Sequence, residues 1–599
     1  MKGINDIEDI EKVPLESHIR ERTAYDVLKA GAAQWPERQA LIFLPFDNPL
    51  GEPFRVTYHQ LFNNVIQIAN LLVMCGITAD KAVSYILPNI PENYFLFFAA
   101  QAVGIANPIS PKLSPDQIAE LLQIAESEIL ISTGPHTDPQ LWENILKVRK
   151  IYPGLKKILI LEDYSDLHQN IENFYRLLAP QPISPLFDEK DINPNAVCSY
   201  FHTSGTVGPP KLVQHTHWGC MHAAWAAGIF AHYQRDNAVV LSGFPLFHVS
   251  APIVEAISAF VYGASIVVMS PQGWADPSVI AHFWKIVERY KGTSMAAVPP
   301  IYKALIQVPL NGESICNLQS AISGNIPISK ADSDAFYRIT GVRISTLWGQ
   351  TEAILGCINP SPAPSNKTFG AAGFRLPYLH MKILKTDKLG KNLQECLPQE
   401  PGALYIKGPN VGRYKNAELN KKAFIHDGWL NTGDRAYQDE DSYIWILGRQ
   451  SDFILWGNTY ISLLTIEATL QENPLIKKAA VINLPTQILN ERVYAFLMVD
   501  QEIAANPSAL IQQLQITLTK KFGSLPIDIE VRKSLPLNGM NKVIKYRLRK
   551  ELKSELDKEG ILASNTKSSH LTTAPIEMTV RPIKKKGHFY KGFIGYFLS

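Results

Sequence analysis

Strand and helix patterns alternate along most of this chain, and that alternation is what most limits the folds open to it. Ala40–Phe43 and Val83–Leu87 are short apolar runs typical of buried strands. Between them, Thr57–Met74 has the apolar spacing of an amphipathic helix. Farther on, Val239–Ser242 has a strand pattern and Val254–Tyr262 a helical one. Such alternation is typical of layered folds with parallel strands, so the sequence predicts an α/β protein.

A change of pattern late in the chain predicts a second, smaller domain. From Pro377 onward, short strands and turns replace the alternation, and the segment after Asp452 indicates an α+β unit. A chain of 599 residues is too long for one ordinary core, which agrees with two domains. We therefore predict an N-terminal extension (1–20), a large multi-layer N-terminal domain with parallel-rich sheets (21–450), a small mobile α+β C-terminal domain (451–558) and a basic, aromatic tail (559–599).

Composition and charge argue against several classes of protein. The chain has 46% apolar and 19% charged residues, as globular proteins do, and its net charge of +3 gives no support for a nucleic-acid partner. The six cysteines are scattered without metal-site spacing, as expected of reduced thiols. Residues 1–22 lack the apolar segment of an export signal, and no apolar run reaches the roughly 18 residues of a membrane-spanning helix. We therefore expect a cytoplasmic protein.

A segment rich in glycine and hydroxyl groups, Tyr200–Lys211, follows one of the predicted strands. It reads Tyr-Phe-His-Thr-Ser-Gly-Thr-Val-Gly-Pro-Pro-Lys. Its backbone N–H groups, the hydroxyls of Thr203, Ser204 and Thr206, and the ammonium of Lys211 form a donor set that suits a polyphosphate. The spacing is not that of the Walker P-loop. An ordinary solvated turn is the alternative, because Gly, Ser, Thr and Pro also mark loops.

Four further motifs, taken in order, decide between these alternatives. They are Trp348–Glu352 (Trp-Gly-Gln-Thr-Glu), Gly428–Asp434 (Gly-Trp-Leu-Asn-Thr-Gly-Asp), Gly448–Asp452 (Gly-Arg-Gln-Ser-Asp) and Leu535–Val543 (Leu-Pro-Leu-Asn-Gly-Met-Asn-Lys-Val). With the loop, they resemble the motifs of the AMP-forming adenylating superfamily, which includes acyl-CoA synthetases, peptide synthetase adenylation domains and firefly-type luciferases. The resemblance covers roughly residues 20–555, and it is greatest to free-standing fatty or aromatic acyl-CoA synthetases.

The resemblance assigns the glycine-rich loop to the phosphates of ATP. The family has a second threonine where this chain has Val207, so one hydroxyl of the cradle is missing. A separate segment, Ser323–Pro327, is similar to the turn that flanks the adenine in this family. The implied ATP contacts in these two segments are Thr203, Ser204, Gly205, Thr206, Gly208 and Lys211, and Gly324, Asn325 and Ile326.

The motifs Trp348–Glu352 and Gly428–Asp434 imply contacts to the rest of the nucleotide. A flat ring at Trp348, next to Gly349, can stack on adenine. The hydroxyl of Thr351 can bond the α-phosphate, and the carboxylate of Glu352 can hold Mg²⁺ bridged to phosphate oxygens. Both residues are implied to be catalytic. An ionised carboxylate can accept from both ribose hydroxyls, which is the role that the resemblance gives Asp434.

The remaining motifs imply a ribose contact, a hinge and a catalytic lysine. Arg449 would help to bind the ribose, Ser451 stands at the hinge between domains, and Gly457 lies near the path of the thiol. Lys542 is the implied catalytic lysine, and His248 is the implied gate between the acyl and nucleotide pockets. This chain departs from the family pattern at Ser451, Asn458 and Asn541.

The resemblance implies a two-step ligase. A carboxylic acid, expected to be a fatty acid, would attack ATP to give an acyl-adenylate, and coenzyme A would then displace AMP. The acyl pocket is expected to draw on 248–256 and 295–302, where Ala296 and its neighbours are small. Two alternatives remain open: an acyl-AMP ligase that loads an acyl carrier protein, and a degenerate paralogue that binds nucleotide or acyl chains in a regulatory role.

The basic, aromatic end of the chain is the last feature that bears on partners. Arg581–Phe597 combines lysines with aromatic residues, a composition that suits peripheral contact with an anionic membrane surface. A solvated end without a partner is the alternative and is favoured.

Overall fold

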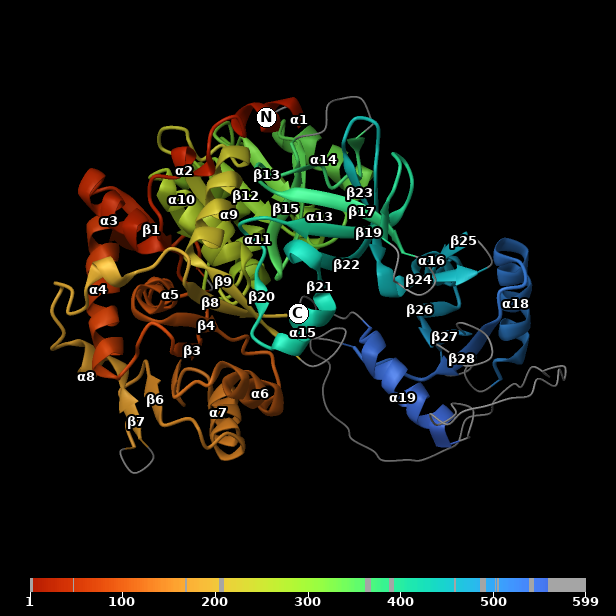
Figure 1. Ribbon diagram of the computed structural model, residues 1–599, viewed down its shortest axis with the longest axis horizontal. Coiled ribbons are helices and arrows are strands. Elements are labelled where there is room, and N and C mark those ends of the chain that lie inside the picture. Colours follow the sequence, from red (N-terminus) through yellow and green to blue (C-terminus); the bar gives the residue numbers. More distant parts are fainter. Residues whose placement is uncertain are drawn as a thin grey trace. The chain divides into compact units, whose positions relative to one another are not determined.

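The computed structural model describes residues 4–46, 48–166, 170–203, 210–360, 368–386, 393–456, 459–484, 492–500, 503, 506–537 and 543–558 (Figure 1). The chain divides into two compact units. Unit 1 comprises Met1–Ser204 and Pro210–Leu447, and the main part of unit 2 begins at Gly448.

Unit 1 contains a nine-stranded sheet whose central strands are parallel. In spatial order the strands are β16 (Phe374–Arg375), β15 (Ala353–Asn359), β14 (Ile344–Gln350), β13 (Ser320–Ser323), β12 (Ser294–Ala297), β10 (Val239–Ser242), β11 (Ser265–Val268), β1 (Gln39–Phe43) and β2 (Phe54–Thr57). The strands from β14 to β1 run parallel, and antiparallel strands close both edges. The carboxyl ends of the parallel strands therefore meet at one edge, where ligands bind in folds of this kind.

A second, eight-stranded sheet carries the glycine-rich loop. Its strands are β20 (Arg413–Tyr414), β9 (Leu212–Thr216), β8 (Val197–His202), β4 (Ile105–Pro108), β3 (Ala82–Ile86), β5 (Ile129–Ser132), β6 (Lys157–Ile160) and β7 (Ile171–Asn173). The run from β8 to β7 is parallel, whereas β9 pairs antiparallel with β8 and β20 with β9. The β8–β9 hairpin thus presents its connecting loop at the carboxyl end of β8.

Helices between the two sheets form the central layer of unit 1. They are α3 (Ala24–Gln34), α4 (Tyr58–Met74), α5 (Pro91–Val103), α9 (His217–Phe230), the π-helical segment Ser250–Ile257 and α10 (Ser258–Val261). Their buried side chains share one apolar core with residues of both sheets. Residues Asn93–Val103 of α5 are all buried, as expected of a helix that is apolar on every side.

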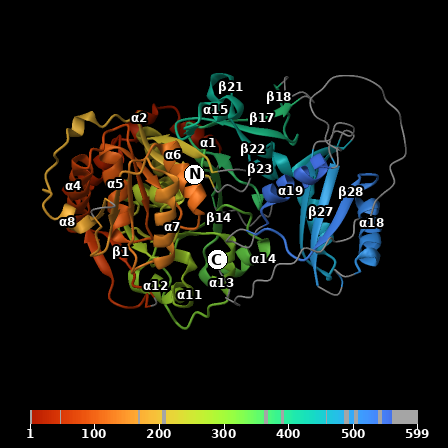
Figure 2. The same cartoon turned by 90° about the horizontal axis from the view of Figure 1, so that it is seen from below.

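Two outer helical layers complete a five-layer arrangement. On the far face of the nine-stranded sheet, a separate core packs α11 (Pro277–Ala281), α12 (Phe283–Tyr290), α13 (Pro299–Ile306) and α14 (Lys330–Thr340), which Figure 2 shows along the lower side of unit 1. On the far face of the eight-stranded sheet, a third core packs α6 (Pro115–Ala125) and α7 (Pro139–Ile151). The short α8 (Phe174–Leu178) follows β7.

A smaller antiparallel sheet follows the two large ones in the chain. It is built from β18 (Leu393–Glu395), β17 (His380–Thr386), β19 (Gly402–Lys407), β22 (Trp429–Gln438), β21 (Phe424–Ile425) and β23 (Ile444–Arg449). The helix α15 (Ala417–Ala423) precedes β21. Strand β22 contains Trp429–Asp434 of the Gly428–Asp434 motif, with Leu430, Thr432 and Asp434 buried on one face.

The N-terminal segment is anchored on unit 1. It forms α1 (Ile4–Ile10) and α2 (Leu15–His18), and Ile7 and Leu15 are buried. The carboxylate of Glu11 pairs with the guanidinium of Arg375, with 2.8 Å between Oε2 and Nη2. The Tyr378 hydroxyl donates to the Ile10 carbonyl at 2.9 Å. These contacts tie residues predicted as an extension to the strand end at β16.

Unit 2 contains a three-stranded sheet, in the order β26–β27–β28, with helices on both faces, and a separate two-stranded sheet, β24–β25. It comprises β24 (Phe453–Trp456), β25 (Thr459–Ser462), α16 (Leu463–Gln471), β26 (Ile476–Leu484), β27 (Arg492–Val499), α18 (Ser508–Phe522), β28 (Ile527–Arg532) and α19 (Lys545–Lys558). One core joins α16 and α18 to the sheet. A second core packs Leu548, Leu552 and Leu556 of α19 against the sheet. Figures 1 and 2 both show α19 on the opposite side of this sheet from α18.

Two helices differ from the sequence expectation. With Asp276 as N-cap and Pro277 as first helical residue, the sequence predicts a single helix up to Tyr290, but the backbone at His282 (φ −108°, ψ 12°) leaves the helical region and separates α11 from α12. The helix expected at Val254–Tyr262 begins earlier, at Ser250, and its first part has π-helical hydrogen bonding. In the part of the chain that the structure describes, no helix has the length and apolar content to cross a membrane.

Candidate active site

The ends of the glycine-rich loop are fixed by the β8–β9 hairpin. The backbone N–H of Thr203 donates to the Lys211 carbonyl at 2.9 Å, and the Lys211 N–H lies 3.4 Å from the Thr203 hydroxyl oxygen. The hairpin therefore brings the first and last predicted phosphate contacts side by side. The predicted contacts between them, Ser204, Gly205, Thr206 and Gly208, lie outside the described residues, as does the departure Val207.

Tyr414 links the loop lysine to the predicted metal ligand. The Lys211 ammonium lies over the Tyr414 ring, 5.4 Å from its centroid, and the Tyr414 hydroxyl donates to Glu352 Oε1 at 2.5 Å. Tyr414 reaches this position because β20 pairs with β9, placing Tyr414 opposite Val213. One aromatic residue thus holds two predicted ATP contacts from different motifs in one place.

The turn that carries Thr351 and Glu352 joins β14 to β15 and is fixed from outside. His215 Nε2 lies 2.8 Å from the Thr351 carbonyl oxygen, and Gly412 N–H donates to the Glu352 carbonyl at 2.9 Å. Burial lowers the pKa of His215 to about 4, so the ring is neutral at physiological pH. Because a carbonyl oxygen only accepts, the proton of His215 resides on Nε2. These bonds hold the turn against β9 and β20.

Trp348 and Asp434 contact each other directly. The indole Nε1–H donates to Asp434 Oδ2 at 3.0 Å, and Asp434 is 4% exposed. The Asp434 backbone N–H donates to the Thr432 hydroxyl at 3.1 Å. A Cβ atom at Gly356 would lie 2.3 Å from Trp348 Cζ3, so only glycine leaves room for the ring there. The structure thus brings together the predicted adenine and ribose contacts.

The other predicted adenine contacts lie at the carboxyl ends of neighbouring parallel strands. Gly324, Asn325 and Ile326 follow β13 directly; Asn325 has a left-handed backbone (φ 70°), and the Ile326 side chain is 46% exposed. Gly349 lies in β14, where a Cβ atom would lie 2.5 Å from the Ile354 carbonyl oxygen. Close approach of two backbones therefore requires glycine at that position.

His248 lies in a mostly buried pair of histidines. Burial lowers the pKa of His248 to about 4, and nearby His202 lowers it further. His248 Nδ1 accepts from the Ser250 N–H at 3.3 Å, which places the proton of the neutral ring on Nε2. His202, which precedes Thr203 of the loop, accepts at Nε2 from the Ser110 N–H at 3.1 Å. His248 is therefore near the residue that begins the phosphate loop.

Unit 2 holds the remaining predicted residues. Arg449 ends β23 and is exposed. The Ser451 carbonyl accepts from Arg549 Nη2 at 3.3 Å, which ties the predicted hinge residue to α19. Gly457 and Lys542 lie outside the described residues, as do the departures Asn458 and Asn541 and the predicted tail, 559–599.

Sequence reasoning assigned no individual role to three residues of these surroundings. Tyr414 and His215 belong to none of the motifs, and their partners Glu352 and Thr351 are 62 and 136 residues away in the chain. Only the strand order β20–β9–β8 brings them to the motifs. The third is Glu255, which had a visible signal as the sole acidic residue in the apolar stretch 250–270.

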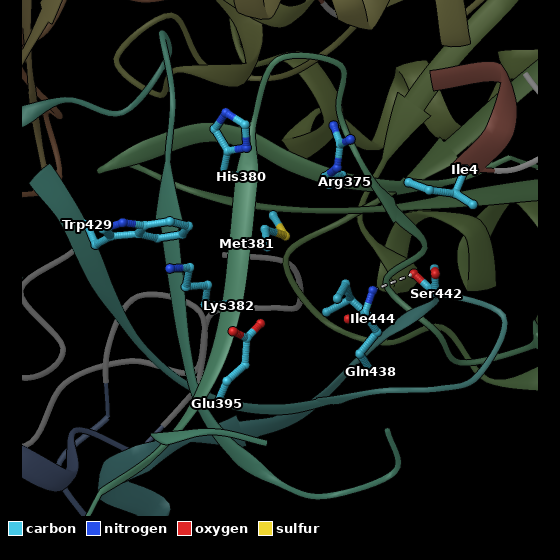
Figure 3. Close-up of a pocket in the computed structure, with 10 residues that line it drawn as sticks. All are labelled: Ile4, Arg375, His380, Met381, Lys382, Glu395, Trp429, Gln438, Ser442 and Ile444. Carbon is cyan, nitrogen blue, oxygen red and sulfur yellow. Dashed lines mark hydrogen bonds between the residues drawn. The ribbon is translucent and has the colours of Figure 1, made fainter. Parts of the chain in front are cut away.

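A pocket of about 230 Å³ lies elsewhere on unit 1, around the small sheet and α1 (Figure 3). The Lys382 ammonium lies over the Trp429 ring, 4.5 Å from its centroid. Gln438 Nε2 lies 3.5 Å from the Ser442 carbonyl oxygen, the bond drawn dashed in Figure 3. Of its lining residues, only Trp429 belongs to a motif, and the predicted site residues are not among them.

Comparison with known protein families agrees with the motifs. A model of the AMP-binding enzymes matches residues 28–414, more than half of the chain. A marinolic acid–CoA ligase from Pseudoalteromonas sp. (strain SANK 73390) is 30% identical over 561 residues, which are 92% of this chain and 84% of that protein. The chain therefore belongs to the AMP-binding enzyme family. The predicted family is confirmed, and so is the predicted class of enzyme, an AMP-forming acid–thiol ligase.

More distant relatives and solved structures extend the comparison. A crotonobetaine/carnitine–CoA ligase from Proteus mirabilis (strain HI4320) is 25% identical over 527 residues, 86% of this chain and 97% of that protein. The solved structure of ATP-bound MatB from Rhodopseudomonas palustris has a TM-score of 0.70 at 21% identity, covering 89% of this chain and 99% of that one. The anthranilate CoA ligase AuaEII with anthranoyl-AMP has a TM-score of 0.68 at 24% identity, covering 89% and 98%. The predicted α/β fold of adenylate-forming enzymes is confirmed.

Proposed function

We propose that this chain activates a carboxylic acid with ATP, forming an acyl-adenylate and pyrophosphate, and then transfers the acyl group to coenzyme A. The observation that carries this proposal is the placement of two motif carboxylates, Glu352 and Asp434. Each accepts a hydrogen bond from an aromatic side chain, Tyr414 or Trp348, that belongs to a different sheet. Carboxylates fixed in this way are positioned to meet a nucleotide without rearranging.

Each part of ATP has a proposed set of contacts. The phosphates bind the loop 203–211 and the Thr351 hydroxyl, the adenine lies by Gly324–Ile326 and the Trp348 region, and the ribose hydroxyls donate to Asp434. Because Asp434 Oδ2 already accepts from Trp348, a ribose bound there would share that carboxylate with the indole N–H. In unit 2, Arg449 is the further ribose contact that we propose.

Glu352 is the proposed ligand of Mg²⁺. No group of three or more acidic, histidine or cysteine side chains that would hold a metal ion occurs in the described ranges. A single carboxylate fits Mg²⁺ nevertheless, because this ion is usually bound by one or two carboxylates together with substrate phosphates and water. Bound there, Mg²⁺ would supply positive charge to the phosphate oxygens. The Tyr414 hydrogen bond would hold the carboxylate in place for it.

The first chemical step joins two anions. A carboxylate oxygen of the acid attacks the α-phosphorus, and the bond to the bridging oxygen breaks as pyrophosphate leaves. Positive charge and hydrogen-bond donors lower the cost of this approach, and we assign that role to Lys542, Lys211 and the loop. In the second step the thiol sulfur attacks the acyl carbon, its proton passes to solvent, and AMP leaves. Neutral His248 is the proposed gate between the two pockets.

The acceptor and the acid are the finer parts of the proposal. Coenzyme A is proposed because the curated relatives described above are CoA ligases by name. A fatty acid is the expected substrate from sequence, whereas those relatives are named for marinolic acid and for crotonobetaine and carnitine. A carrier protein in place of coenzyme A, cytoplasmic location and membrane contact through the tail stay predictions.

A screen of carboxylic acids for AMP release, with and without coenzyme A, tests the proposal. We expect AMP and the acyl-CoA thioester in equal amounts for at least one class of acid. AMP release that needs an acyl carrier protein, and not coenzyme A, would replace the proposed acceptor. Nucleotide binding without AMP release from any acid would indicate the regulatory alternative and overturn the proposal.

The variant Lys542→Ala tests the proposed catalytic role of this lysine, and a control variant accounts for general effects on folding. Loss of a group that stabilises developing charge costs on the order of several kcal/mol, so acid-dependent pyrophosphate exchange should nearly vanish. Lys520→Ala, at a lysine in the last turn of α18, is the matched control and should keep wild-type exchange. Wild-type exchange in Lys542→Ala would contradict the assignment.

A further inference from the structure

Glu255 is a buried carboxyl group to which the proposed mechanism gives no role. It lies in the π-helical segment Ser250–Ile257 and is 2% exposed. The Ser242 hydroxyl donates to its Oε2 at 2.5 Å. Its Oε1 is equally buried and has no hydrogen-bond partner in the described structure. A buried carboxyl oxygen without a partner is costly, and native proteins rarely keep one without a reason.

Two other buried hydroxyl groups lie on the same side of the sheet. Among the described residues, the hydroxyl oxygen of Ser258 also lacks a hydrogen-bond partner, whereas the hydroxyl of Ser294 lies beside that of Tyr233. Ser258 is three residues after Glu255 along the helix, and Ser294 begins β12. Glu255 also adds to the effect of burial in raising the pKa of Tyr94 and Tyr233, which places both phenols in its electrostatic neighbourhood. The group is a polar cluster inside an apolar core.

Partly exposed residues lie beside this cluster. Strand β12 is interior to the nine-stranded sheet, yet the Ala296 side chain is only partly buried. The register pairs Leu241 with Met295, so Ser242 on β10 lies level with Ala296 and on the same face. Glu255, bonded to Ser242, therefore lies next to the accessible surface over Ala296.

The segment that leads from His248 to Glu255 also carries partly exposed residues. Phe247 is partly exposed, and so are Ser250 and Val254, which lie one turn apart on the π-helical segment, although that segment belongs to the central layer of unit 1. The partly exposed surface thus runs from the proposed gate residue His248 toward Glu255. π-helical turns often occur at functional sites, and here the π-helical segment begins two residues after His248 and carries Glu255.

We propose that Glu255 determines acyl specificity and that the acid activated by this enzyme carries a hydroxyl group, which pairs with Glu255 Oε1. This inference rests on the proposed function. An unsubstituted fatty chain over Ala296 would leave Oε1 and the Ser258 hydroxyl without partners. A hydroxyl group both donates and accepts, so it suits a carboxyl and neighbouring serine and tyrosine hydroxyls.

A neutral hydroxyl fits the surroundings better than a cationic amine. Burial raises the pKa of Glu255 to about 8, so the carboxyl is protonated at neutral pH and can also donate a hydrogen bond. The polar groups around Glu255 are all uncharged, so none of them offsets the cost of burying an ion pair between a cationic amine and the carboxylate. They are the side chains of Ser242, Ser258, Ser294, Tyr94 and Tyr233.

The test is a matched series of acids assayed by coenzyme A-dependent AMP release. Each straight-chain acid is compared with its hydroxy derivatives, with the hydroxyl moved along the chain, and with the corresponding amino acids. We expect one hydroxyl position at which kcat/KM exceeds that of the unsubstituted acid by about tenfold or more, since buried polar groups reject a ligand that leaves them unpaired. A preference for the unsubstituted acid at every position, or for the amino derivative, would overturn the inference.

Two variants of similar size assign the preference to Glu255. Glu255→Gln retains donor and acceptor atoms and should keep the preference for the hydroxy acid. Glu255→Leu should abolish or invert it, mainly through KM for the acid, while KM for ATP stays unchanged. If Glu255→Leu does not fold, Ser258→Ala serves as a milder variant and should reduce the preference. A hydroxy preference that persists undiminished in both Glu255→Leu and Ser258→Ala would refute the role of the cluster.

Failure of this inference is distinguishable from failure of the proposed function. AMP release from some acid without any hydroxyl preference would refute the role of Glu255 and leave the ligase intact. No AMP release from any acid would refute the ligase itself and the inference with it.

Discussion

Three buried or partly buried carboxyl groups mark the nucleotide side and the acyl side that we propose for unit 1. On the nucleotide side, Glu352 accepts from Tyr414, and Asp434 accepts from Trp348. On the acyl side, Glu255 is bonded only through Oε2 to Ser242, while Oε1 has no partner in the described residues. The first two are held in place before ATP arrives. The third leaves one oxygen for a substrate group to fill.

The difference also lies in the backbone that carries each group. Glu352 is in a strand-to-strand turn fixed by His215 and Gly412, and Asp434 is within a β-strand. Glu255 is on a π-helical segment beside partly exposed residues. The comparison leads us to propose different roles for these groups. Glu352 and Asp434 determine the rate for every acid, and Glu255 determines which acid is used.

Glu352→Gln should cause the largest loss, and it should affect every acid alike. Removing the carboxylate charge at the α-phosphate removes the proposed metal ligand, and a fall in pyrophosphate exchange of roughly 100- to 1,000-fold is expected. Glu418→Gln, at an exposed glutamate of α15 paired with Lys421, is the matched control. A loss confined to hydroxy acids would contradict the proposed roles.

Asp434→Asn should weaken ATP binding, with a smaller effect on turnover. The amide oxygen can still accept from Trp348, so the fold should persist, but charge-assisted bonds to the ribose are lost. KM for ATP should rise by roughly 10- to 100-fold, equally for all acids. Initial-rate kinetics at saturating acid measure this, and an unchanged KM for ATP would remove Asp434 from the ribose site.

Tyr414→Phe should have a moderate effect that tests preorganisation. The ring remains for Lys211, but Glu352 loses its hydrogen bond, which is worth about 1.5–3 kcal/mol for a charged group. We expect kcat to fall by about tenfold and the Mg²⁺ requirement to shift to higher concentration. Tyr337→Phe, at an exposed tyrosine of α14, is the control. Wild-type kcat in Tyr414→Phe would show that Glu352 is positioned without it.

Lowering the pH should have the smallest effect of these changes, a gradual loss of folding stability. Burial lowers the pKa of His215, His217, His222 and His248 to about 4, whereas an unfolded histidine titrates near 6.5. The unfolded state therefore binds more protons between these values, and stability falls as pH falls from about 6.5 to 4. Glu255, with its pKa raised to about 8, opposes this as a single group. A melting temperature that rises as the pH is lowered from 6.5 to 5 would contradict these assignments.

The sequence predicted the layers and the motif residues, but not the contacts between motifs. The alternation of strand and helix patterns indicated parallel sheets, because periodicity follows from which face of each element is buried. Tyr414 could not be found in this way, since its role depends on the pairing of β20 with β9, two strands that lie about 200 residues apart in the chain. Glu255 was visible as an acid in an apolar stretch, but its unpaired oxygen depends on side-chain packing.

Isotope transfer from acid to AMP tests the central claim, activation of the acid at the α-phosphorus, most directly. An acid that carries ¹⁸O in its carboxylate is incubated with the enzyme, ATP, Mg²⁺ and coenzyme A, and the products are weighed by mass spectrometry. One carboxylate oxygen should remain on phosphorus when the thiol displaces AMP, so AMP should carry one ¹⁸O atom and pyrophosphate none. Unlabelled AMP, or ¹⁸O in inorganic phosphate accompanied by ADP, would contradict the proposed chemistry.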